Sequence, residues 1–132
     1  MSTTAYLLDT NILIEFFTKK PQTVALLPIL KKNGRLTTSL LSVAEIRMGW
    51  NDRDAKVFLP LLYDLFETQG LTREIVEQAG VWRMEYKEQG ITLSSMDTLI
   101  AATAYCMNMC VVSRNVKHFP MPELQLFAEP GF

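Results

Sequence analysis

YLLDTNILIEFF, residues 6–17, is the segment that decides the fold. Residues 6–8 are a short apolar run that ends at an acid, as the first strand of a buried parallel sheet does. The apolar residues of 13–17 then recur at helical spacing, and Thr10 or Asn11 is placed to cap the start of that helix. A strand, an acid and a helix therefore follow one another without a gap.

The rest of the chain continues this alternation of strands and helices. Asn33-Gly34 turns the chain, Gly90 stops a long amphipathic helix and Ser94 caps the next one. Further helices are expected over residues 23–32, 42–50, 55–63, 72–89 and 94–107, and further strands over 35–38, 65–68, 109–113 and 124–127. Residues 119–132 are expected to be irregular surface chain around one edge strand. This order predicts an α/β fold with a mainly parallel central sheet.

Length and composition indicate one globular domain over residues 1–132. A chain of 132 residues can bury a core without disulfides, and 48% apolar with 20% charged residues excludes a disordered chain or a coiled coil. The spacing of Cys106 and Cys110 fits neither a redox pair nor a zinc knuckle, so two buried thiols in a reducing cytosol are expected. The sequence has no leader-like segment and no run of about 20 apolar residues, which predicts a cytoplasmic protein outside the membrane.

The net charge of −1 argues against a nucleic-acid partner unless basic residues gather locally. Such a local rim and scattered solvated charges are equally compatible with the sequence. The candidates for the rim are Lys31, Lys32, Arg35, Arg47, Arg53, Lys56, Arg114 and Lys117.

Four polar residues are expected to meet at one edge of the sheet, because ligands of parallel α/β sheets collect beyond the carboxyl ends of the strands. Asp9 ends the first strand and Glu45 opens the helix after the second strand. Asp97 opens a later helix, and Asn115 follows the strand that ends at Ser113. The sequence thus predicts a site built from Asp9, Glu45, Asp97 and Asn115.

Three carboxylates in one site repel each other unless a cation or a proton neutralises them. Ligation by oxygen alone, from Asp9, Glu45 and Asp97, favours Mg²⁺ or Mn²⁺ over zinc. Such an ion polarises a phosphodiester and makes water acidic enough to attack it. Metal-dependent hydrolysis of an RNA backbone is the activity that this donor set favours.

At these residues the sequence resembles the PIN-domain ribonucleases, and among them the VapC-type toxins of toxin–antitoxin pairs. Residues 7–12, 39–49, 97–104 and 111–119 are similar to the four motifs of that family, in the family's order, and the likeness runs from residue 5 to about residue 120. The resemblance implies a three-layer α/β/α fold, metal binding by Asp9, Glu45 and Asp97, an RNA substrate, a VapB-type antitoxin and a homodimer. Two positions depart from the pattern: the fourth acid is Asn115, and Ser113 stands where a threonine is common. The missing charge at Asn115 favours one metal ion over two.

Each of the three acids also has a structural interpretation that involves no metal ion. Ser42 and Glu45 have the spacing of a capping box, in which Glu45 serves helix stability alone. Asp97 is also placed to stabilise a helix N-terminus, and Asp9 to end a strand in a turn. The order of the four motifs favours metal ligation for all three acids.

For the neighbouring residues, a structural role is either favoured over a role in the site or equally compatible with the sequence. We expect Asn11 to be a plain helix cap, with a supporting hydrogen bond to Asp9 as the alternative. Ser113 either orients a ligand or is a strand-end hydroxyl, and contact of His118 with substrate is the less favoured alternative. Solvated surface is expected for Glu15, Glu67 and Glu74, and core or helix packing for Trp50, Phe58, Phe66, Trp82 and Tyr86.

Two other functions stay open at this point. A haloacid-dehalogenase-like phosphatase would use Asp9 as a nucleophile, but it would also want an aspartate where Asn11 stands. A non-catalytic module would bind nucleic acid or protein through the same surface, and its binding would survive loss of the acids.

Overall fold

The computed structural model describes residues 4–128. The strands in this part are β1 (Thr4–Leu8), β2 (Gly34–Ser39), β3 (Glu67–Gln69), β4 (Cys110–Val112) and β5 (Gln125–Leu126). The α-helices are α1 (Thr10–Phe17), α2 (Pro21–Asn33), α3 (Leu40–Gly49), α4 (Asp52–Leu65), α5 (Arg73–Glu88) and α6 (Ser95–Cys106), and Val116–His118 form a 3-10 turn. Each predicted element is present, with ends displaced by a few residues at most.

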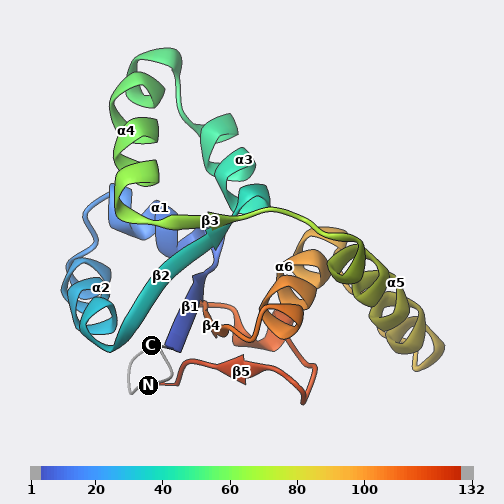
Figure 1. Cartoon of the computed structure of the whole chain (residues 1–132). Helices are drawn as coiled ribbons and strands as arrows, with labels where there is room; N and C mark the ends of the chain where they lie inside the picture. The colour runs from blue at the N-terminus through green and yellow to red at the C-terminus, as the bar shows by residue number, and fades with distance from the viewer. Residues whose placement is uncertain (1–3, 129–132) are drawn as a thin grey trace.

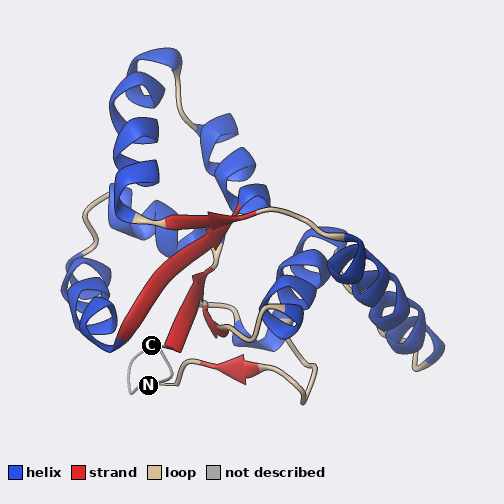
Figure 2. Cartoon of the chain, viewed as in Figure 1, coloured by secondary structure: helices blue, strands red, loops and turns tan. Residues whose placement is uncertain are grey.

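The strands form one sheet in the order β3-β2-β1-β4-β5, and every neighbouring pair in it is parallel (Figure 2). The central strand is β1, whose Leu8 pairs with Thr38 of β2 and Val112 of β4. The predicted α/β fold with a parallel sheet is confirmed. Because the strands run the same way, their carboxyl ends lie along one edge of the sheet.

Helices cover both faces of the sheet, which gives three layers (Figure 1). Successive side chains of a strand point to opposite faces, and β1 divides accordingly. Ala5 and Leu7 belong to a core with residues of α5 and α6, whereas Tyr6 and Leu8 belong to a core with residues of α1, α2, α3 and α4. The second core includes the Phe17, Trp50 and Phe58 rings as close neighbours. The structure thus confirms a packing role for these aromatic residues.

Two helix starts differ from the expectation in ways that matter for the site. The cap of α1 is Asp9 itself, not Thr10 or Asn11. The cap of α3 is Ser39, whose hydroxyl accepts a hydrogen bond from the Leu41 amide, so the helix begins earlier than residue 42. A helix beginning at the end of β2 leaves no room for loop residues between strand and helix.

The chain after α6 is more buried than expected. Phe119 and Met121 are 1% and 2% exposed and pack into the core under α5 and α6, so the surface-chain prediction is wrong for them. Residues 129–132 of that predicted tail lie outside the described residues. Cys106 and Cys110 are free thiols, but both are only half-buried. No helix in residues 4–128 combines the length and the apolar character that a membrane crossing needs.

Candidate active site

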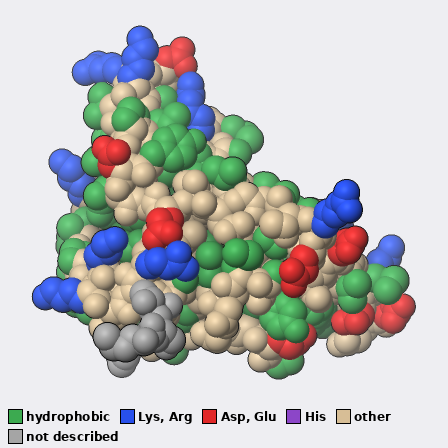
Figure 3. All heavy atoms as spheres, in the orientation of Figure 1, with side chains coloured by type: hydrophobic (Ala, Val, Ile, Leu, Met, Phe, Trp, Pro, Cys, Tyr) green, Lys and Arg blue, Asp and Glu red, His purple; other side chains and the backbone are tan. Residues whose placement is uncertain are grey.

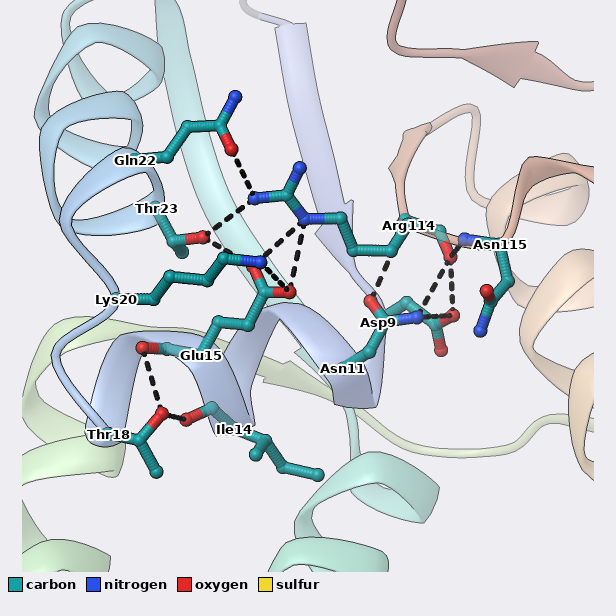
Figure 4. A network of polar contacts seen from close by, with 11 residues as sticks. Asp9, Asn11, Ile14, Glu15, Thr18, Lys20, Gln22, Thr23, Arg114 and Asn115 are labelled. Atoms are coloured by element: carbon teal, nitrogen blue, oxygen red, sulfur yellow. Dashed lines mark hydrogen bonds and ion pairs between the residues drawn. The ribbon is translucent and has the colours of Figure 1, made fainter. Parts of the chain in front are cut away.

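Asp9 stands at the carboxyl end of the central strand and is 6% exposed. Its Oδ1 accepts a hydrogen bond from the Thr10 amide at 2.9 Å, which makes Asp9 the cap of α1. Its Oδ2 accepts one from the Ser113 hydroxyl at 2.7 Å and lies 3.4 Å from Asn11 Nδ2 (Figure 4). Strand β1 positions the backbone of Asp9, and residues of α1 and of the chain after β4 orient its carboxylate.

The pKa of Asp9 is raised above its ordinary value of 3.8. The largest cause is burial, which disfavours the charged form, and the negative charges of Asp97 and Glu45 add to it. The hydrogen bonds from Ser113 and Thr10 act in the opposite direction. Both other predicted acids therefore lie within electrostatic reach of Asp9, in a site with an excess of negative charge.

Glu45 is linked to the start of α1 by Thr10. The Thr10 hydroxyl donates to Glu45 Oε1 at 2.6 Å and lies 2.9 Å from the hydroxyl of Ser42, which is buried inside α3. Since Ser39 caps α3, Ser42 and Glu45 do not form a capping box, and the purely helical interpretation of Glu45 is wrong. Its carboxylate points instead toward the residue that follows Asp9.

Asp97 lies in the first turn of α6, where its amide donates to the capping hydroxyl of Ser94 at 3.0 Å. The Asp97 side chain is 26% exposed, and its Oδ2 lies 3.5 Å from His118 Nδ1. Within residues 4–128, Asp97 is connected to the rest of the site by this contact with His118 and by the effect of its charge on the pKa of Asp9. The single histidine thus faces an acid of the site.

Asn115 joins the group through its backbone. Its amide donates to the Ser113 hydroxyl at 3.0 Å, while the Asn11 amide group lies 3.3 Å from the same oxygen. The structure therefore brings Asp9, Asn11, Ser113 and Asn115 into one hydrogen-bonded group. The plain-cap interpretation of Asn11 is wrong, and the alternative, a supporting contact to Asp9, is the one observed.

Sequence reasoning missed two parts of this arrangement. Thr10 was expected to be a cap, and its spacing of 35 residues from Glu45 gives no local signal of their contact. Glu15 was expected at the solvated surface, and Arg114 either in a basic rim or among scattered solvated charges, yet they form an ion pair in which each side chain is 17% exposed. Glu67 and Glu74 are exposed, as expected.

The comparisons with known proteins agree with this fold. The family model of the PIN domain matches residues 6–120, so the chain belongs to the PIN-domain family. Ribonuclease VapC10 of Mycobacterium tuberculosis is 36% identical over 104 residues, covering 76% of this chain and 77% of the relative. Ribonuclease VapC1 of Haemophilus influenzae is 30% identical over 123 residues, covering 86% and 89%. Within the PIN family the chain is of the VapC type.

Solved structures support the same assignment. The VapBC2 complex of Rickettsia felis, bound to a DNA fragment from its promoter, contains a chain that superposes with a TM-score of 0.84 at 26% identity, covering 94% of this chain and 98% of that one. The VapBC-1 structure of nontypeable Haemophilus influenzae gives a TM-score of 0.82 at 27% identity, covering 94% and 97%. FitAcB of Neisseria gonorrhoeae gives 0.77 at 26% identity, covering 93% and 96%.

Proposed function

We propose that this protein is a divalent-metal-dependent endoribonuclease that hydrolyses RNA phosphodiester bonds and serves as the toxin of a toxin–antitoxin pair. The observation that carries the proposal is the buried Asp9 carboxylate, whose pKa the charges of Asp97 and Glu45 raise further. An uncompensated cluster of this kind calls for a cation. Its VapC relatives are named as ribonucleases, which supports RNA as the substrate.

The residues fit an ion of the magnesium type better than zinc. Every candidate ligand offers oxygen, and residues 4–128 contain no group of three or more His, Cys, Asp or Glu side chains placed as a ready-made metal cage. Magnesium usually binds through one or two carboxylates and keeps several waters, so it needs no such cage. Asp9 would hold the ion, with Glu45 and Asp97 adding charge and further oxygens. When bound, the ion supplies positive charge that stabilises an attacked phosphodiester and makes water more acidic.

The chain's own residues prepare the site for that chemistry. Ser113 and the Thr10 amide fix the two oxygens of Asp9, and the Thr10 hydroxyl fixes Glu45. Groups held by such supporting hydrogen bonds need little reorganisation when substrate arrives. We assign Asn115 to the same site as an uncharged oxygen donor at its rim.

The distribution of charge suits a polyanionic substrate despite a net charge of −1. On the face shown in Figure 3, most Lys and Arg side chains lie over the α3–α4 end and the α2 side, whereas most acidic side chains lie over α5. Positive potential on one part of a surface attracts nucleic acid even when the total charge is near zero. This charge distribution predicts contacts with the phosphate backbone of RNA, and such contacts do not select a base sequence.

We also propose two protein partners, an antitoxin and a second copy of the chain. The solved VapBC complexes support an antitoxin of the VapB type, and a basic residue of that partner would complement the acidic site. Exposed apolar side chains support a homodimer: Met48 is 78% exposed and Val57 is 63% exposed. Light scattering after size-exclusion chromatography measures the mass of the isolated protein, and a monomeric mass at all concentrations would refute the proposed homodimer.

The geometry disfavours the phosphatase alternative. Asn11, where such an enzyme would need a second aspartate, instead contacts Asp9 through its Nδ2. Hydrolysis of a phosphomonoester such as p-nitrophenyl phosphate would bring this alternative back.

The deciding experiment incubates the purified protein with RNA and Mg²⁺ or Mn²⁺, with and without EDTA. Asp9→Ala and Asp97→Ala should abolish cleavage, whereas Asp64→Ala, which removes an exposed carboxylate of α4, should not. Cleavage in EDTA, or full activity of both site variants, would remove the proposal. RNA binding without cleavage, unaffected by either variant, would favour the non-catalytic module.

A further inference from the structure

A second polar network starts at the residue after Ser113 and leads away from the site (Figure 4). Arg114 Nε donates to both oxygens of the Glu15 carboxylate, at 2.9 and 3.1 Å. Arg114 Nη2 donates to Gln22 Oε1 at 3.0 Å and lies 3.4 Å from the hydroxyl of Thr23. Glu15 belongs to α1, and Gln22 and Thr23 belong to α2. One arginine side chain therefore ties the end of β4 to two helices.

Glu15 is held in place for this contact. Its Oε1 also accepts a hydrogen bond from the Thr23 hydroxyl at 2.5 Å, and Lys20 Nζ lies 3.3 Å from Oε2. Thr23 is fully buried, so the carboxylate is anchored to the interior of the molecule. Burial raises the pKa of Glu15, but the hydrogen bonds from Thr23, Arg114 and Lys20 outweigh it and lower that pKa overall. Glu15 accordingly stays ionised opposite Arg114.

The backbone of the same arginine reaches the acidic site. The Arg114 amide donates to Asn11 Oδ1 at 3.3 Å, and Asn11 Nδ2 lies 3.3 Å from Ser113 Oγ. Asn11 and Glu15 are four residues apart in α1, so they lie on one face of that helix. Residue 114 is thus docked along α1 at two points, by its main chain on Asn11 and by its side chain on Glu15.

We propose that Glu15 and Arg114 are positioning residues of the active site. Their ion pair holds residues 113–115 against α1, so that the Ser113 hydroxyl stays aimed at Asp9 and Asn115 stays at the rim. This inference rests on the proposed ribonuclease function. A half-buried ion pair is a weak source of net stability, because desolvation offsets the attraction. What it supplies here is a fixed direction, since a guanidinium binds several oxygens in one plane.

The proposal also takes Arg114 out of the set of residues that would contact RNA. Its side chain is 17% exposed and its donors face Glu15, Gln22 and Thr23. A phosphate would have to compete for this guanidinium with the carboxylate already bound to its Nε. Replacing Arg114 should therefore change the turnover number and leave the KM for RNA nearly unchanged, the reverse of what loss of a phosphate contact would do.

The test removes both charges at once, with Glu15→Gln/Arg114→Met, so that no lone charge is left half-buried. We expect kcat for RNA cleavage to fall about 10- to 100-fold, the effect of a small displacement at a catalytic site. Arg114→Lys keeps the charge but loses the planar set of guanidinium donors, so its kcat should lie between those of the double variant and wild type. The matched control is Lys87→Met/Glu88→Gln, which removes one exposed side chain of each charge at the end of α5, and it should stay within about twofold of wild type.

A second measurement needs no RNA. Hydrogen exchange followed by NMR reports the amides of Arg114 and Asn115, which donate to Asn11 Oδ1 and Ser113 Oγ. Both should exchange about tenfold faster in the double variant, while core amides keep their rates. Near-UV circular dichroism verifies the fold, and Glu15→Gln alone replaces the double variant if that variant unfolds.

The outcomes separate this inference from the proposed function. If either cleavage or exchange is unchanged in a folded variant, the positioning role is overturned. A fall in affinity for RNA with kcat unchanged would also overturn it, because Arg114 would then be a substrate contact. A wild-type protein that cleaves no RNA would refute the proposed function, and the exchange rates would still decide whether the pair positions residues 113–115.

Discussion

Removal of the Ser113 hydroxyl tests the electrostatics of the site most directly. Ser113 Oγ donates to Asp9 Oδ2 at 2.7 Å, and the two residues are 2% and 6% exposed. A hydrogen bond to a charged group contributes about 1.5–3 kcal/mol, against about 0.5–1.5 kcal/mol between neutral groups. We therefore expect Ser113→Ala to lower the free energy of unfolding of the metal-free protein by about 2 kcal/mol at neutral pH.

The size of this loss should depend on pH, in a direction set by Asp9. Burial first, and then the charges of Asp97 and Glu45, raise its pKa, which the Ser113 hydrogen bond holds down. A group whose pKa is raised by folding binds its proton more tightly in the folded state, so the free energy of unfolding falls as pH rises through that pKa. Without the hydroxyl the pKa rises further, and the fall becomes larger and extends to higher pH. Each added pKa unit increases the loss at neutral pH by about 1.4 kcal/mol relative to acid.

Urea denaturation in EDTA, followed by circular dichroism from acidic to neutral pH, measures this difference. Thr38→Val is the matched control, because the fully buried Thr38 hydroxyl donates at 3.0 Å to the Leu8 carbonyl, which does not titrate. Its effect should be the same at every pH. The reasoning would be refuted by a loss for Ser113→Ala that is equally constant, or larger in acid than at neutral pH. Either result would show that the Ser113 hydrogen bond does not favour the charged form of a buried Asp9.

Three further predictions follow from neighbouring contacts. Asp97→Asn should weaken magnesium binding measured by calorimetry. The metal-free variant should melt at the same or a higher temperature than wild type, because a charge that raises the pKa of Asp9 is gone. A clearly lower melting temperature would contradict repulsion between Asp97 and Asp9. Thr10→Val, which removes the 2.6 Å contact to Glu45, should reduce RNA cleavage about 10- to 100-fold with the fold intact, and unchanged cleavage would show that this contact does not matter. Glu15 has a lowered pKa, so its ionised form stabilises the fold above the unfolded pKa and that contribution disappears as pH falls through the lowered value. Urea titrations should therefore show the difference between wild type and Glu15→Gln shrinking in acid, and a difference that grows in acid would be evidence against the pairing with Arg114.

The parts of the fold that could be predicted are those with a local signal. The apolar run at residues 6–8, the helix start at Thr72, the cap Ser94 and the stop at Gly90 each depend on a few neighbouring residues, and the structure agrees with them. The position of Asp9 was predictable for the same reason, since an acid directly after a buried strand must lie at the carboxyl edge of a parallel sheet.

The polar contacts that support the acids had no such signal. Thr10 meets Glu45 across 35 residues and Arg114 meets Glu15 across 99, so no periodic pattern connects either pair. A charged side chain alone indicates solvent, and only the folded structure reveals that Glu15 has an arginine opposite it. Burial of Phe119 escaped prediction similarly, because the surrounding prolines suggested loose surface chain while the residue packs under α5 and α6.

The division of the core between the two faces of the sheet links the proposed ion binding to cooperative folding. Asp9, the cap of α1, and Glu45 of α3 lie on the side of the larger helical layer, whereas Asp97 comes from α6 in the opposite layer. A partly unfolded chain that has lost either layer would retain only a fraction of the acidic cluster and would bind cations weakly. Magnesium should consequently stabilise the fully folded state alone, and its concentration should shift the unfolding of both layers together.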